Sequence, residues 1–71
     1  MIDYDRTAEG MLGGLISWLV LEGRDLSHYS VSRFVCEEMM GATADSRSKV
    51  ARALYELATR PPIRYPDQGS W

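Results

Sequence analysis

The sequence predicts a mainly α-helical fold, in which three helices form one compact domain over residues 1–71. Apolar residues recur at three- and four-residue spacing in three separate segments, as they do in amphipathic helices. Gly23, Gly41 and Pro61 follow these segments, and residues of these types end helices. A short alternation at 63–65 is typical of a strand, so residues 61–71 could add a small β-wing.

The first helix is expected to begin near Thr7, a good N-cap residue, and to stop at Gly23. Glu9 would lie in the first turn, where the helix dipole favours an acidic side chain. The inward stripe is predicted to consist of Met11, Leu12, Leu15, Ile16, Leu19 and Val20. Three glycines, Gly10, Gly13 and Gly14, fall inside this helix although each costs about 1 kcal/mol relative to alanine. We expect them to let another backbone approach closely.

The second helix is expected from Ser30, as its cap, to about Met40, and the third from about Ser46 to Thr59. Thr43 and Asp45, in the preceding turn, are cap candidates for the third helix. The inward positions are Val31, Phe34, Val35 and Met39 in the second helix, and Val50, Ala53, Leu54, Leu57 and Ala58 in the third. Pro61-Pro62 forbids continuation of the third helix.

The composition is that of a globular protein, with 45% hydrophobic and 25% charged residues and a formal net charge of −2. A single cysteine, Cys36, cannot form an internal disulfide, which favours a reducing, cytoplasmic location. We expect Cys36 to pack as a small hydrophobic side chain. The longest apolar run is far shorter than the roughly 20 residues of a membrane span, and no signal peptide is visible, so no membrane partner is expected.

Two stretches of the sequence resemble parts of winged helix-turn-helix DNA-binding domains. "SVSRFVCEEMM" (30–40) is similar to the support helix of that family, and "KVARALYELATRPPIRY" (49–65) to its recognition helix and the lead into the wing. The matching positions of the second stretch are Val50, Leu54, Leu57, Ile63 and Arg64. Two features depart from the family: the turn before the third helix is longer than usual, and Pro62 stands where a glycine is common. The resemblance implies that the third helix binds the major groove of DNA.

Charge is unevenly spread along the chain. Residues 43–71 carry five basic and three acidic residues, a balance of +2, whereas the first 42 carry three basic and seven acidic residues, a balance of −4. DNA binding would therefore depend on the C-terminal half. The expected DNA-binding residues lie at the start of the third helix and beside the wing: Ser46, Arg47, Ser48, Lys49, Arg52, Arg60 and Arg64.

Protein binding is the alternative function. Very small, acidic, helical proteins are common in phages and mobile elements, where they bind and block a host protein or nucleoprotein complex. The interface residues are expected to be Trp18, Glu37, Glu38, Met40 and Trp71, of which Trp18, Met40 and Trp71 supply apolar anchors. Asp3, Asp5, Glu9 and Glu22 would extend the acidic surface, which could occupy a basic groove of the partner. A homodimer, with the first helix at its interface, is compatible with either function.

Catalysis is not expected, nor is a cofactor or metal. Asp25, Ser27 and His28 include the residue types of a hydrolytic triad, but three residues of one short loop cannot easily align with one another as nucleophile, base and orienting group. One cysteine and one histidine fall short of a zinc site. The sequence therefore favours a small regulator that acts by binding.

Overall fold

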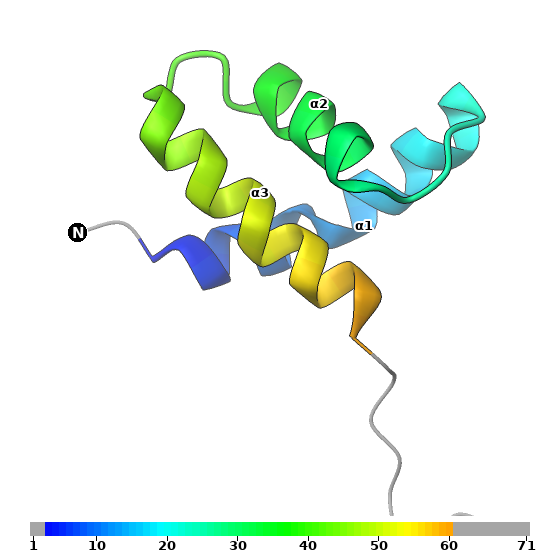
Figure 1. Cartoon of the computed structure of the whole chain (residues 1–71), viewed down its shortest axis with the longest axis horizontal. Helices are drawn as coiled ribbons and strands as arrows, with labels where there is room; N and C mark the ends of the chain where they lie inside the picture. The colour runs from blue at the N-terminus through cyan, green and yellow to red at the C-terminus, as the bar shows by residue number, and fades with distance from the viewer. Residues whose placement is uncertain (1–2, 61–71) are drawn as a thin grey trace, which may run out of the picture.

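The part of the chain that the structure describes, residues 3–60, is built from three α-helices (Figure 1). The structure is a computed structural model. Helix α1 spans Tyr4–Glu22, α2 spans His28–Glu38 and α3 spans Ala44–Thr59, and residues 3–60 contain no strand. The predicted mainly α-helical, three-helix fold is confirmed. The predicted wing falls at 61–71, outside the described residues.

Helix α3 is the centre of the packing. It crosses α1 and packs beside α2, whereas α1 and α2 contact each other far less (Figure 1). Fully buried side chains from all three helices meet on it: Leu15, Val31, Val35, Val50 and Leu54. Full burial of one such side chain contributes about 1.5–3 kcal/mol. The fold therefore depends on the apolar side of α3.

The first helix begins one turn earlier than predicted. Asp3 is the N-cap, because its Oδ1 accepts a hydrogen bond from the backbone amide of Arg6 at 3.1 Å. Thr7, the predicted cap, instead donates its hydroxyl to the Asp3 carbonyl oxygen at 3.0 Å. Aspartate and threonine are both good caps, and the extra turn packs Tyr4 against the core.

Helices α2 and α3 begin with the same hydrogen-bond arrangement. Ser27 caps α2 by accepting from the Ser30 amide at 3.1 Å, and Thr43 caps α3 by accepting from the Ser46 amide at 3.1 Å. Each cap hydroxyl also donates to the hydroxyl of that serine, at 3.2 and 3.0 Å. Ser30 is thus a buried residue of the first turn, and its prediction as the cap was wrong. The third helix likewise begins at Ala44, before Ser46, and α2 ends at Glu38, before Met40.

The inward stripes of α2 and α3 are confirmed, but that of α1 is narrower than predicted. Leu15 is buried, and Met11, Leu12 and Leu19 are partly buried against the core. Ile16 and Val20, however, are 55% and 76% exposed. The reason is that α1 is covered by α3 along one side, while its contact with α2 is slight.

The glycines of α1 differ in their surroundings. A Cβ added at Gly14 would lie 3.3 Å from Cζ of the Phe34 ring, so this glycine makes room for an aromatic side chain. A Cβ at Gly10 or Gly13 would meet nothing within 4 Å. The expected close approach of another backbone at these glycines was wrong. Gly23 adopts φ 63° and ends α1 in the left-handed conformation.

Alanine substitution separates these roles. Gly13→Ala should raise the free energy of unfolding by about 1 kcal/mol, because alanine favours the helix and has open space around it. Gly14→Ala should raise the free energy of unfolding by less than this, or lower it, because the Phe34 ring must shift. Urea unfolding followed by circular dichroism measures both, and an equal gain at the two positions would contradict the packing described.

Candidate functional site

The basic residues predicted to bind DNA do not share one side of α3. Arg47 and Lys49 are two positions apart, which places them about 200° apart around the helix axis. Arg47 is partly buried on the side that faces α2, and Lys49 is exposed on the side that faces α1. The Ser46 side chain is buried in the cap of α3, so its predicted accessibility was wrong.

Lys49 is held by side chains of its own chain. Its Nζ lies 3.1 Å from the Asp45 carboxylate and 5.4 Å from the centre of the Tyr4 ring. The hydrogen bond from Lys49 to Asp45 and the charge of that carboxylate raise the pKa of Lys49. Such an exposed pair is weak and can exchange partners, but it lowers the positive charge that α3 presents.

The remaining residues of the predicted DNA site differ in where they lie. Arg47 donates from Nη1 to the Met40 carbonyl oxygen at 3.5 Å. Ser48 and Arg52 are exposed on the outer side of α3, whereas Arg60 is exposed at its C-terminal end. Arg64 lies outside the described residues. Ser48, Lys49 and Arg52 therefore lie on neighbouring sides of α3, because Lys49 and Arg52 are three positions apart, whereas Arg47 points away from them.

The predicted protein-binding residues also separate into two groups. Glu37, Glu38 and Met40 are exposed at the C-terminal end of α2. Trp18, by contrast, is partly buried, with its ring centre 5.6 Å from that of Phe34 and the guanidinium of Arg24 5.6 Å above it. Trp18 therefore supports the core, and Trp71 lies outside the described residues.

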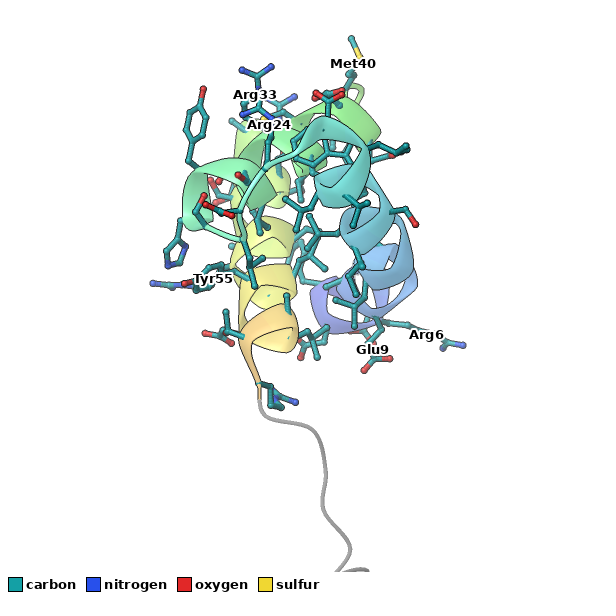
Figure 2. The ribbon with its side chains drawn as sticks, turned by 90° about the vertical axis from the view of Figure 1, so that its right-hand side faces the viewer. Arg6, Glu9, Arg24, Arg33, Met40 and Tyr55 are labelled. Carbon is teal, nitrogen blue, oxygen red and sulfur yellow. The ribbon has the colours of Figure 1, made fainter. Side chains whose placement is uncertain are left out.

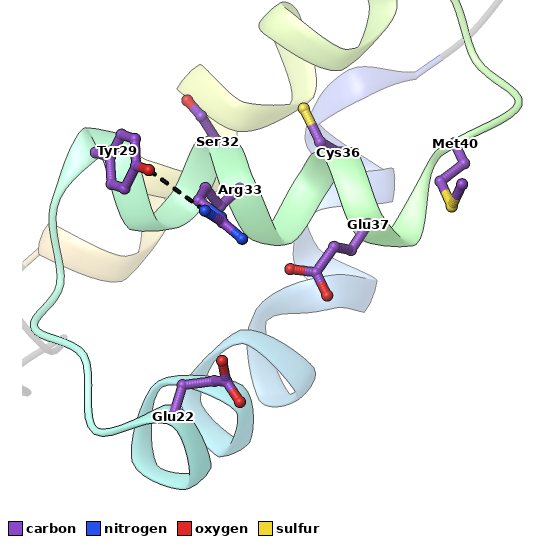
Figure 3. A pocket seen from close by; sticks show the side chains of 7 residues that line it. All are labelled: Glu22, Tyr29, Ser32, Arg33, Cys36, Glu37 and Met40. Carbon is purple, nitrogen blue, oxygen red and sulfur yellow. Dashed lines mark hydrogen bonds between the residues drawn. The ribbon is translucent and has the colours of Figure 1, made fainter.

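An open groove of about 590 Å³ lies between the outer side of α2 and the C-terminal end of α1 (Figure 3). We call it the α2 groove. Three residues of the predicted interface and acidic surface, Glu22, Glu37 and Met40, line it together with four that were not assigned to a site: Tyr29, Ser32, Arg33 and Cys36. Tyr29 and Met40, 64% and 78% exposed, are its large apolar side chains.

A contact between Tyr29 and Arg33 forms one end of the α2 groove (Figure 3). Arg33 Nη1 donates to the Tyr29 hydroxyl at 3.3 Å, and its guanidinium lies 6.0 Å from the ring centre. This hydrogen bond and the positive charge of Arg33 lower the pKa of Tyr29 below the ordinary value of a tyrosine. Their i, i+4 spacing on one helix was the signal in the sequence that could have identified the pair.

A second, smaller hollow of about 170 Å³ lies on the other side of α2, against the first half of α3. Ser32 and Cys36 line both hollows, and Arg47 and Ser48 line the smaller one. Cys36 is exposed, so its predicted packing in the core was wrong. Ser32 and Cys36 thus lie between the two hollows, and the single thiol is accessible there.

Two of the three residues considered for catalysis, Ser27 and His28, have structural contacts. Ser27 caps α2, and the ring of His28 stacks on that of Tyr55 with their centres 3.7 Å apart. Within residues 3–60, no three histidine, cysteine, aspartate or glutamate side chains are grouped to hold a metal ion.

Comparison with known protein families, with curated proteins and with solved structures gives no match for this chain. In the described part of the chain, none of the three helices has the length and apolar character needed to span a bilayer.

The Tyr29–Arg33 contact can be tested by titration. Because the pKa of Tyr29 is lowered in the folded chain, its ionised phenolate is favoured there, and its contact with Arg33 strengthens as the pH rises through the range in which tyrosine ionises. Arg33→Leu should therefore shift the first step of tyrosine ionisation, read by ultraviolet absorbance, to higher pH. An unchanged titration curve would contradict the contact, and Arg6→Leu, on the exposed side of α1, is the matched control.

Proposed function

We propose that the protein is a non-catalytic regulator that binds another protein through the α2 groove and acts by occupying that partner's surface. The observation that carries the proposal is the pair of exposed large side chains, Tyr29 and Met40, at an open groove. Tyrosine and methionine are enriched at protein interfaces, and a pocket beside them can receive side chains of the partner.

Charge supports a protein partner over a nucleic acid. Residues 3–60 hold seven arginines and lysines against nine aspartates and glutamates, and two of the acidic residues, Glu22 and Glu37, line the α2 groove. A phosphate backbone would be repelled there. A protein surface with basic and apolar side chains would not.

Truncation of the apolar side chains tests this proposal. The protein is immobilised, the protein that it retains from a lysate of its source cells is identified and purified, and the affinity is measured by calorimetry. Tyr29→Ala and Met40→Ala should each weaken binding about fivefold to tenfold, because buried anchors dominate interface energies.

Val20→Ala is the matched control, since Val20 is as exposed as Met40 but lies on α1 outside the α2 groove. Equal losses for the groove and control variants would refute the assignment. So would retention of DNA with no retained protein.

DNA binding is the second candidate, favoured by two observations. Helices α2 and α3 follow each other in helix-turn-helix order, and Ser48 and Arg52 are exposed together on the outer side of α3. A helix of this kind fits the major groove, where an arginine can bind guanine through two hydrogen bonds.

A mobility-shift assay at two salt concentrations tests the DNA candidate. Arg52→Ala should weaken the DNA complex. If Arg52 binds a phosphate, the variant should also reduce the salt dependence of binding by about one contact, and if Arg52 binds guanine, the preference for guanine should be lost. Arg6→Ala, on α1, is the control and should leave affinity, salt dependence and base preference unchanged. If micromolar protein gives no shift in low salt, the DNA candidate is excluded.

A further inference from the structure

We infer that the α2 groove takes a basic amphipathic segment of its partner, in which a lysine or arginine is flanked by apolar side chains. This inference rests on the proposed function and specifies the chemistry of the partner. Its basis is the combination of two carboxylates and two large apolar side chains around one groove.

The carboxylates face the groove from two different helices. Glu22 is the last residue of α1 and Glu37 belongs to the last turn of α2, and Figure 3 shows both side chains directed into the space between the helices. Glu37 forms no ion pair within residues 3–60. Glu22 forms one, with Arg24, and its 4.0 Å separation is that of a weak contact. Both carboxylates can therefore accept a cation from outside the chain.

The helix ends make the groove still more negative. The C-terminal end of a helix carries a partial negative charge, which basic side chains in the last turn usually offset. The last turns of α1 and α2 contain no basic residue and instead carry Glu22, Glu37 and Glu38. Like charges are thus placed together at both helix ends, and a bound lysine or arginine would relieve this repulsion.

Arg33 compensates only part of this charge. It is the basic residue among those that line the groove, against two glutamates, and it donates to the Tyr29 hydroxyl. The lining therefore keeps a formal charge of −1, which one cationic side chain of the partner would neutralise.

The apolar side chains set the length of the segment. The nine positions from Tyr29 to Glu38 correspond to about 14 Å along the axis of α2, and Met40 lies two residues beyond Glu38. A partner helix of roughly three turns could place apolar side chains on both and a basic side chain between them. Glu37 lies between these two apolar side chains, beside Arg33, and Glu22 lies across the groove on α1. Apolar ends with a net acidic lining between them match a basic amphipathic segment.

The test uses a fluorescein-labelled helical peptide of roughly 14 residues, with leucine on one side and lysine on the other, titrated by anisotropy. One comparison peptide carries glutamate in place of lysine, and another carries serine in place of leucine. Glu22→Gln/Glu37→Gln should weaken binding of the leucine–lysine peptide about fivefold. The matched variant Glu9→Gln/Glu56→Gln removes two exposed glutamates outside the groove and should leave the affinity unchanged.

Cys36 gives an independent reading, because it is the single cysteine, is exposed and lines the groove. Bound leucine–lysine peptide should slow its alkylation by iodoacetamide at least fivefold. Unchanged alkylation, equal losses in the two double variants, or equally tight binding of either comparison peptide would overturn the inference. The inference would also be overturned if the protein without peptide were a dimer in which Cys36 resists alkylation, because a second copy of the chain would then occupy the groove.

The two proposals can fail separately. If the natural partner requires Tyr29 and Met40 but binds Glu22→Gln/Glu37→Gln at full affinity, protein binding through the groove stands and the basic segment is excluded. If the natural partner requires neither Tyr29 and Met40 nor Glu22 and Glu37, both proposals fail.

Discussion

The burial of one side of α3 between α1 and α2 is the constraint on which the rest of the structure depends. Val50 and Leu54 lose all contact with water there, against Leu15 of α1 and Val31 and Val35 of α2. Because α1 and α2 contact each other little, α3 is what joins them. The same arrangement leaves the outer side of α2 uncovered, and this uncovered side forms a wall of the α2 groove.

Most of the fold could be predicted from apolar spacing, because the buried positions of α2 and α3 recur every three or four residues. Ile16 and Val20 continue the same spacing in α1, yet they are exposed, since spacing identifies an apolar side without showing whether a neighbouring helix covers it. Thr43, a predicted cap candidate, does cap α3, whereas the cap of α2 was misassigned for a different reason. Ser27 and Ser30 are of one type, and only their hydrogen bonds show which of them precedes the helix.

The candidate site was less predictable, because it is made by tertiary packing. Glu37 and Met40 were expected at an interface, whereas Glu22 reaches the same groove only because the end of α1 lies beside α2. The sequence alone could have shown that Arg47 and Lys49 point in different directions, since side chains two positions apart on a helix lie on nearly opposite sides. The pairing of Lys49 with Asp45 could not have been found in this way, because i, i+4 spacing allows an ion pair without showing that it forms.

Because α1 and α2 both bury apolar side chains against α3, the stability of the chain should be greatest in α3. Native-state amide hydrogen exchange measures this most directly, because it reports the free energy of opening at each residue. The amides of Val50, Ala51 and Leu54 should exchange last and only through global unfolding. Slower exchange in α2 than in α3, or exchange of these α3 amides through local opening, would contradict the account.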